Sequence, residues 1–458
     1  MAAHEPLRGP SRRRRRWPAI LALALLAIVA AACSATPGPR GWAGARPVSV
    51  EEPGLVLAAY KKTLYAIDPA QLSPLWQFPP ENRDSYPISE RSQDRIRDAI
   101  DALSIPDSEK ESLRALVAEI TISGDSIDLF KDAVDNSSAT DDEKNDLNNG
   151  VDDITAIEED AVRNVEAFYG DVGVSDDQQT AYAPGYGGWL YALNIETGET
   201  RWLVNVGDQM VGGVAVDDDR LYLGTKGATL FAIDPETGAA IDAFAGDGSF
   251  KVDDEIWSTP AVTEDAIYVT TMSGAVYAID KSGQQRWIFE RPSASIAMRP
   301  VVDGDTVYAG AFDKKLYAIS ATDGSERWRF EGDEWFWSAP VVRDGALFAA
   351  SLDGKVYALS ADDGSTRWER PFDAEAEVRA ALTTGARGIV VAGRNGMVYQ
   401  LDPATGEALS SLEAGRNIEA DLTSDAAGAV YAVPRDPAVL FIIDTSSQLA
   451  ATFFELPQ

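Results

Sequence analysis

The residues that could perform acid–base, nucleophilic or metal chemistry are few in this sequence. The chain of 458 residues contains one histidine, His4, and one cysteine, Cys33. Because both lie near the N-terminus, the main body lacks the imidazole on which Ser-His-Asp triads, histidine bases and His-ligated zinc or iron depend. Aspartate and glutamate are abundant, but most lie in turns, where they cap backbone N–H groups. The sequence therefore predicts no catalytic residues and no metal site.

A group of tryptophans and arginines is suited to recognition instead. Similar segments recur at 257–260 (WSTP), 297–300 (AMRP), 337–340 (WSAP) and 379–382 (RAAL). We expect each segment to begin an innermost strand of a repeating unit, so that their side chains surround one mouth of a common channel. The predicted binding residues are Trp257, Arg299, Trp335, Trp337 and Arg379. Exposed tryptophan and arginine dominate binding hot spots, and arginine can hold a carboxylate or an acidic peptide through two hydrogen bonds. The alternative is that the tryptophans are buried between units and the arginines pair with acidic neighbours.

The elements that would position these residues are sequence repeats. Eight copies of one phrase, first Leu-Tyr-Ala-Ile-Asp, begin at positions 64, 190, 230, 276, 316, 356, 398 and 440. From the second copy on, the starts lie 40 to 46 residues apart, a period typical of repeat architectures. Three turn signals per unit, many with glycine, predict four short antiparallel strands. The phrase is apolar on both faces, which predicts sheets covered on both sides, as in a stack of radial blades.

A tryptophan follows the phrase by 11 or 12 residues in five of the units. These residues are Trp76, Trp202, Trp287, Trp328 and Trp368. A large ring at a fixed place in each fourth strand is predicted to fill the wedge between neighbouring blades. The third and seventh units lack it and carry Ile241 or Phe244 and Leu409 nearby. We expect those two interfaces to be less well filled.

Together, the phrase, the following Thr/Asp-Gly turn and the tryptophan resemble the PQQ-like β-propeller repeat. The resemblance implies an all-β, eight-bladed propeller of four-stranded antiparallel blades, with seven blades as the alternative. The first unit lacks a clear inner strand, for which residues 46–50 are the candidate. Two unlike groups share the repeat: quinone-dependent dehydrogenases, and non-enzymatic propeller lipoproteins similar to the BamB subunit of outer-membrane protein assembly.

The dehydrogenases, as the resemblance implies, use Ca²⁺-bound PQQ, an acidic general base and commonly a vicinal cysteine pair. This chain has no Cys-Cys pair, and none of its motifs matches such a ligand set. The resemblance therefore favours a protein that is not an enzyme and carries no cofactor.

The N-terminus predicts export and attachment to a membrane. Five arginines at 12–16 precede an apolar stretch at 19–32 and then Cys33. This order is typical of a signal peptide, and the stretch is short for a membrane span. Residues 30–33 (AAAC) resemble a bacterial lipobox, which implies a lipoprotein signal peptide at 1–33 and lipidation of Cys33. An ordinary signal peptide with an incidental cysteine is the alternative. Residues 34–50, rich in proline, glycine and alanine, are predicted to form a flexible tether.

Residues 82–169 interrupt the first unit and change its character. Apolar residues recur at helical spacing, as at Ile96, Ile100 and Leu103, and Thr140 with Glu143 fits a capping box. We expect four or five short helices in a small acidic bundle, inserted at a connection between blades and removable without unfolding the propeller. The propeller would then comprise 51–81 and 170–458. The insertion is either a spacer or a docking module, and no EF-hand register fits 140–153.

The formal net charge of −33 opposes binding to phosphate backbones and anionic lipid, so no nucleic-acid partner is predicted. The sequence predicts an extracytoplasmic protein anchored by lipid to the cell membrane, or to the outer membrane where a cell has two. Its predicted function is that of a non-catalytic scaffold propeller that binds other envelope proteins or peptides, with envelope protein assembly as the candidate process, as a monomer or within a hetero-complex. The alternatives are a PQQ-dependent oxidoreductase and a surface carbohydrate-binding or sensor module that uses Trp337.

Overall fold

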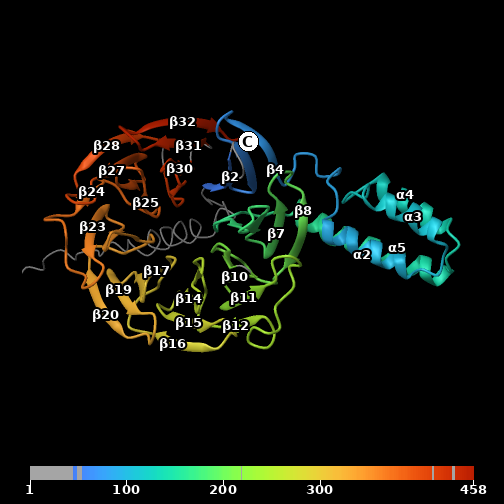
Figure 1. The fold of residues 1–458 in the computed structure, drawn as a ribbon, viewed down its shortest axis with the longest axis horizontal. Helices are drawn as coiled ribbons and strands as arrows, with labels where there is room; N and C mark the ends of the chain where they lie inside the picture. Colours follow the sequence, from blue (N-terminus) through green and yellow to red (C-terminus); the bar gives the residue numbers. More distant parts are fainter. Residues whose placement is uncertain (1–44, 49–53, 218, 415–416, 436–438, 458) are drawn as a thin grey trace, which may run out of the picture. The chain divides into compact units, whose positions relative to one another are not determined.

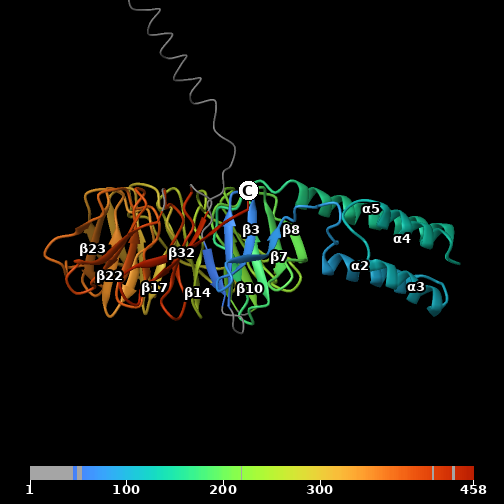
Figure 2. The same ribbon diagram turned by 90° about the horizontal axis from the view of Figure 1, so that it is seen from above.

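Eight four-stranded antiparallel sheets form the body of the protein. The computed structural model describes residues 45–48, 54–217, 219–414, 417–435 and 439–457 (Figure 1). In every sheet the strands follow one another in chain order, and the sheets stand as blades around a ring (Figure 1). Seen from the side, the blades form a flat disc (Figure 2). The predicted eight-bladed all-β propeller is confirmed.

The first four blades are built from sixteen strands. They are β1 (Ala45–Val48), β2 (Leu55–Tyr60), β3 (Thr63–Asp68) and β4 (Ser73–Phe78); β5 (Gly173–Val174), β6 (Thr180–Pro184), β7 (Trp189–Asn194) and β8 (Thr200–Asn205); β9 (Ala215–Asp217), β10 (Arg220–Gly224), β11 (Thr229–Ile233) and β12 (Ser249–Lys251); β13 (Ala261–Val262), β14 (Ala266–Thr270), β15 (Val276–Asp280) and β16 (Gln285–Phe289).

The last four blades repeat the arrangement. Their strands are β17 (Val301–Asp303), β18 (Thr306–Gly310), β19 (Lys315–Ser320) and β20 (Glu326–Glu331); β21 (Val341–Arg343), β22 (Ala346–Ala350), β23 (Lys355–Ser360) and β24 (Phe372–Asp373); β25 (Thr383–Thr384), β26 (Ile389–Ala392), β27 (Met397–Leu401) and β28 (Ala408–Glu413); β29 (Thr423–Ser424), β30 (Val430–Ala432), β31 (Val439–Asp444) and β32 (Ala450–Glu455). The repeated phrase forms the third strand of each blade. In β19, Leu316, Tyr317, Ala318 and Ile319 are all buried, which is the two-sided burial expected of a sheet between two neighbours.

In five of the units a tryptophan in or just before the fourth strand fills the wedge to the next blade, as predicted. Trp202 is 1% exposed and packs among apolar residues of the third blade, including Leu221 and Ile233. Its indole N–H donates to the carbonyl oxygen of Pro235 at 2.9 Å. Equivalent bonds run from Trp76, Trp287, Trp328 and Trp368 into their neighbouring blades. Each ring therefore supplies both apolar contact and one directional bond between blades.

Two junctions use other side chains in place of the tryptophan. After the third blade, buried Phe244 lies 5.8 Å from the ring of Tyr222, and the backbone N–H of Ala245 donates to Ser282. After the seventh blade, fully buried Gln400 donates to the carbonyl of Thr445 at 2.8 Å. A phenyl ring and an amide thus stand where the other units place an indole.

The ring closes between the first and the eighth blade through side chains, because none of the sheets in the described part of the chain combines strands from its two ends. The inner strand β1 pairs with β2, Arg46 facing Leu57, so the first blade begins within the range predicted as tether. The hydroxyl of Tyr60 donates to the carbonyl of Arg435 at 3.0 Å, and that of Tyr65 to the carbonyl of Pro457 at 2.6 Å. An apolar cluster spans the same seam and includes Val56, Ile67, Tyr431, Leu440 and Leu456.

Four helices lie between β4 and β5, within the predicted insertion. They are α2 (Glu90–Ala102), α3 (Asp107–Val117), α4 (Asp125–Asp135) and α5 (Asp141–Arg163). They project from the rim of the disc (Figure 2), and we call residues 82–169 the helical arm. The expected capping box is present: Thr140 accepts from the backbone of Glu143, whose side chain accepts from the backbone of Thr140. The first four N–H groups of a helix have no partner within it, and the capping box supplies acceptors for two of these groups in α5.

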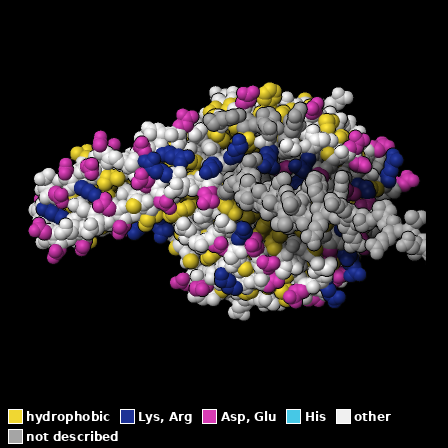
Figure 3. All heavy atoms as spheres, turned by 180° about the vertical axis from the view of Figure 1, so that it is seen from behind, with side chains coloured by type: hydrophobic (Ala, Val, Ile, Leu, Met, Phe, Trp, Pro, Cys, Tyr) yellow, Lys and Arg dark blue, Asp and Glu magenta, His cyan; other side chains and the backbone are white. Residues whose placement is uncertain are grey.

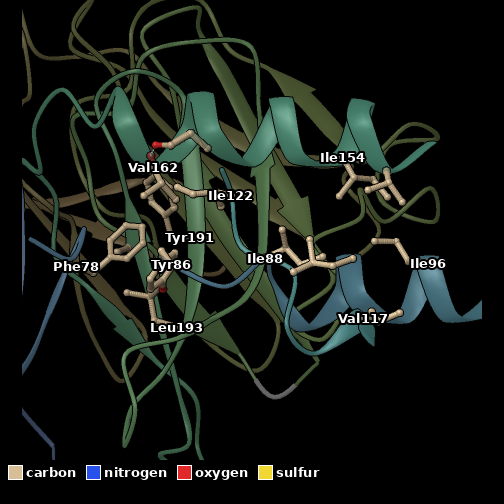
Figure 4. Packing of buried hydrophobic residues seen from close by; sticks show 14 of the residues in the cluster. Phe78, Tyr86, Ile88, Ile96, Val117, Ile122, Ile154, Val162, Tyr191 and Leu193 are labelled. Atoms are coloured by element: carbon tan, nitrogen blue, oxygen red, sulfur yellow. Dashed lines mark hydrogen bonds between the residues drawn. The ribbon is translucent and has the colours of Figure 1, made fainter. Parts of the chain in front are cut away.

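The arm and the propeller share one hydrophobic core. Phe78 of β4 and Tyr191 of β7 lie in the same cluster as Tyr86 and Val162 of the arm (Figure 4). The hydroxyl of Tyr191 donates to the carbonyl of Ala161 at 2.8 Å, and that of Tyr86 to a carbonyl of the second blade at 2.9 Å. The arm is therefore packed into the junction of the first two blades.

A buried carboxylate connects α5 to the start of α2. Glu158 is 3% exposed. It accepts from the backbone N–H of Ser89 at 2.7 Å, from the Ser89 hydroxyl and from the Ser92 hydroxyl. Ser89 is also the N-cap of α2. Burial raises the pKa of Glu158 above its ordinary value, while the hydrogen bonds from the two serines oppose that shift.

We expect a Glu158→Gln variant to become more stable relative to the wild type as the pH rises. A carboxyl whose pKa is raised by folding contributes stability below its unfolded pKa and loses that contribution as the pH passes its folded pKa. Glutamine cannot ionise, so the melting temperature of the variant minus that of the wild type should rise as the pH increases above the ordinary glutamate pKa of about 4.3. Glu158→Ala, which leaves Ser89 and Ser92 without an acceptor, should lower the melting temperature throughout. Parallel curves for wild type and Glu158→Gln would contradict this assignment.

The predicted signal peptide (1–33), Cys33 and residues 34–44 lie outside the described residues. Among the helices that the structure does describe, none has the length and apolar character needed to cross a bilayer.

Candidate binding site at the channel mouth

Two sets of loops meet on one face of the ring and position the predicted binding residues. One set connects consecutive blades, and the other joins the second and third strands within a blade. Backbone hydrogen bonds hold the sets together, because Phe312 donates to Ser295 at 2.9 Å and Leu352 donates to Trp335 at 2.7 Å. Arg394 donates to Glu377 in the same way at 2.8 Å. The repeat therefore places side chains of adjacent blades next to one another around the channel.

Four of the five predicted residues line one cavity at the channel mouth. This cavity has a volume of about 310 Å³ and is lined by Trp257, Arg299, Trp337 and Arg379. Trp257 and Trp337 are half-buried, so each keeps part of its ring accessible, in contrast to the alternative of full burial between blades. The fifth residue, Trp335, is outside this lining and is 39% exposed.

Trp335 joins the site through a phenylalanine that the sequence did not single out. Phe312 lies between the two tryptophans, with ring centroids 4.8 Å from Trp335 and 5.3 Å from Trp337 and interplanar angles of 14° and 8°. The guanidinium of Arg379 lies 5.4 Å from the Trp337 ring. Three parallel rings and one cation thus form a continuous stack, which we call the aromatic stack. Such a stack is rigid and presents flat apolar faces beside a positive charge.

A chain of ion pairs orients Arg379. Its Nη2 lies 3.3 Å from Glu377, which also binds Arg394 at 2.7 Å. Arg394 in turn contacts Glu419 at 3.0 Å, and Glu419 contacts Arg435 at 3.3 Å. The neighbouring arginines lower the pKa of Glu377, Arg394 most of all. Local pairing of Arg379 with an acidic neighbour, the alternative left open by the sequence, is therefore present, and it leaves three guanidinium groups for two carboxylates.

Two carboxylates and an arginine are shared by two neighbouring cavities of the channel. Asp171, Arg299 and Asp421 line both the mouth cavity and a second cavity of about 400 Å³. Asp421 accepts from the backbone N–H of Ala381 at 2.6 Å. Burial and the charge of Asp171 raise the pKa of Asp421 to about 6. Arg299 is exposed to the channel, and within the described residues no ion pair includes it, so its guanidinium can bind an added group.

Sequence reasoning missed Phe312, Tyr169, Tyr186 and Lys226, which all belong to this site. Tyr169 and Tyr186 pair edge to face at 5.2 Å. Tyr169 ends the helical arm, so the arm contributes to the mouth. The weak signal for Phe312 and Lys226 was their place in the turn between the second and third strands, where other units have Met272 and Leu352.

The channel does not match the ligand set that a quinoprotein would need. Within the described residues, no three side chains of His, Cys, Asp or Glu type are grouped to hold a metal ion. Asp171 and Asp421 form a pair beside a cation, which is a poor environment for Ca²⁺.

An eight-bladed ring whose third strands carry the repeated phrase, with an inter-blade tryptophan in five of its eight units, is a PQQ-like β-propeller. The family described as "Outer membrane protein assembly factor BamB" matches residues 186–310 and 293–454, which together span more than half of the chain. The chain belongs to this family.

Individual relatives match over shorter ranges. The outer membrane protein assembly factor BamB of Shewanella oneidensis is 24% identical over 176 residues, covering 34% of this chain and 42% of that protein. The serine/threonine-protein kinase AfsK of Streptomyces griseus is 29% identical over 163 residues, covering 33% of this chain and 20% of the kinase. The chain therefore spans less than half the length of these curated relatives.

Solved structures share the fold. BamB from Moraxella catarrhalis has a TM-score of 0.51 at 20% identity, covering 60% of this chain and 85% of that one. The computationally designed Ika8 protein has a TM-score of 0.53 at 17% identity, covering 63% and 86%. At 17–20% identity these likenesses show the fold alone, and a function has to be argued from the site.

Proposed function

We propose that this protein is an exported scaffold propeller that binds a segment of another envelope protein at its channel mouth and catalyses no reaction. A signal peptide at 1–33 would direct export, and a lipid on Cys33 would attach the protein to the membrane. Nucleic acid is not a partner, because the net charge of −33 repels phosphate backbones.

The observation that carries the proposal is the aromatic stack. Trp335, Phe312 and Trp337 are held parallel and continue into Arg379. Rigid aromatic rings bury large areas with little loss of side-chain entropy, and arginine adds bidentate bonds to a carboxylate or a backbone carbonyl. We therefore expect the bound segment to place an aromatic or aliphatic side chain on the stack and an acidic group near Arg379 or Arg299.

The comparisons support a scaffold role in general terms. Relatives named as outer membrane protein assembly factors match about a third of this chain. The match to AfsK covers a fifth of that kinase, so a kinase activity does not follow for this chain. Envelope assembly remains the candidate process.

A photo-crosslinking residue in place of Trp335 tests the proposal in intact cells of the source organism. We expect discrete adducts with one or a few envelope proteins. Trp337→Ala or Arg379→Ala in the same chain should reduce the adducts by about tenfold, because each removes a contact of hot-spot type.

The matched control position is Asp323, which is exposed in the turn between β19 and β20, at the opposite end of β19 from Phe312. A crosslinker there should give none of these adducts. Adducts that persist in Trp337→Ala and Arg379→Ala, or that appear equally from position 323, would refute a channel-mouth site. Absence of protein adducts together with binding of glycans that Trp337→Ala abolishes would instead establish the carbohydrate-binding alternative.

A further inference from the structure

The helical arm has a groove of its own between α2 and α5. The groove has a volume of about 210 Å³. Its floor is formed by the buried residues Ile96, Leu147, Val151 and Ile154, while Ile157 at its wall is 51% exposed. An exposed isoleucine beside a recessed apolar floor can bury further area only against another molecule.

Two small residues keep this groove open. Ala99 lines it on α2 and Gly150 on α5. A Cβ atom added to Gly150 would meet nothing within 4 Å. Glycine in a helix interior is less favourable than alanine. Because the surrounding structure would accept a side chain, the fold does not require glycine at this position, and its effect is to leave room for one apolar side chain from outside.

The charge around the groove selects the kind of partner. Asp146 and Asp153 stand exposed on its α5 side, and no ion pair within the described residues includes either of them. By contrast, Asp152 on the same helix pairs with Lys131. Acidic side chains are spread over the arm (Figure 3). A basic segment would therefore find unpaired carboxylates beside the apolar floor.

Arg95 is the basic residue of the lining and lies on the α2 side. Asp146 and Asp153 both lie on α5, so the lining carries one positive and two negative side chains, and the two negative ones stand together on the α5 side of the groove.

We propose that the groove between α2 and α5 docks a basic amphipathic segment of a partner protein. One large apolar side chain of that segment enters the space above Gly150 and packs against Ile157. Lysine or arginine residues beside it pair with Asp146 and Asp153. This surface is formed by the arm alone, so the inference stands independently of the channel mouth. A protein with both surfaces can hold two segments at once, which raises the effective concentration of one for the other.

The test places a photo-crosslinking residue at position 157 in the full-length protein in cells. The matched control position is Leu129 of α4, which is 58% exposed and outside the groove lining. We expect adducts from position 157 and none from 129. Mass spectrometry of the crosslinked peptide should identify a basic segment with a leucine, methionine or phenylalanine.

A filling substitution separates binding from folding. Gly150→Leu should reduce the adducts by about tenfold or more, while its melting temperature should equal or exceed that of the wild type, because leucine favours the helix. Asn149→Leu, exposed on the same helix outside the lining, should leave the adducts unchanged. The double variant Asp146→Lys with Asp153→Lys should also reduce them. No adduct at 157, adducts indifferent to Gly150→Leu, or an acidic crosslinked peptide would overturn the proposal.

Discussion

Deleting residues 82–169 is expected to destabilise the propeller itself, in contrast to the expectation from sequence that the insertion is removable. Phe78, Tyr191 and Leu193 are at most 1% exposed and share a cluster with the arm (Figure 4). Exposing such a side chain costs about 1.5–3 kcal/mol. The end of the arm is also bonded to the first blade: the backbone N–H of Phe168 donates to the carbonyl oxygen of Lys61 at 2.8 Å.

The expected loss is several kcal/mol, against a total stability of about 5–15 kcal/mol for an ordinary domain. With residues 81 and 170 joined by a short Gly/Ser linker, the melting temperature should fall by about 10 °C or more, or the protein should aggregate. Circular dichroism and calorimetry would measure the change.

A second deletion provides the matched comparison. Replacing only residues 89–164 retains Tyr86, Ile88, Val165 and Phe168, which are buried at the root of the arm. We expect this variant to melt above the full deletion, because the retained residues still cover Phe78 and Tyr191. If the full deletion melts cooperatively within about 2 °C of the wild type, the arm is a separate module, and the core that it shares with the propeller contributes little to the free energy of unfolding.

Trp202→Ala should be among the most damaging single substitutions in the ring. It removes a fully buried indole, for which losses of about 3–5 kcal/mol are typical, and the hydrogen bond to Pro235. On the other side of the same contact is Gly238, at φ +68°. A Cβ there would lie 2.5 Å from the Trp202 ring, so Gly238→Ala should also destabilise the protein, through both the clash and the left-handed backbone.

The two substitutions should be strongly non-additive. In the Trp202→Ala background the clash disappears, so adding Gly238→Ala should then carry only the backbone strain of about 1 kcal/mol or somewhat more. Gly207→Ala measures that strain alone, because Gly207 has φ +79° and a Cβ there meets nothing within 4 Å. Urea unfolding of the four variants provides the comparison. Additive free energies of unfolding would show that Trp202 and Gly238 do not contact as described.

The periodic part of this fold could be predicted from sequence because each unit repeats the same apolar phrase and the same turn signals at nearly constant spacing. The spacing of Trp202 and its equivalents placed a ring at five of the wedges, and the third and seventh units could be recognised as exceptions. The inner strand β1 was harder, because four residues without the repeated phrase carry little pattern. Its pairing with β2 becomes visible only in three dimensions.

The site was predictable only in part. Trp337 and Arg379 stood out by residue type at a recurring position, and the structure brings them together. Phe312 occupies a turn position where the other units differ in residue type, so only its place in the turn could have indicated it. Its stacking arises because loops of adjacent blades meet. The burial of Tyr86 against the propeller was hidden for a similar reason: helical periodicity tells which face of a segment is covered, and leaves open what covers it.

The seam between the first and eighth blades has a consequence for the order of folding. Two hydrogen bonds cross it, and the residues that they join are separated by 375 and 392 positions in the sequence. All other pairs of adjacent blades are consecutive in the chain. Closing so long a loop has an entropic penalty that local pairing of strands avoids. Blades can therefore assemble in succession before the circle is complete, and the seam should be the last contact to form and the first to open, exposing β1 and the strands beside it to hydrogen exchange.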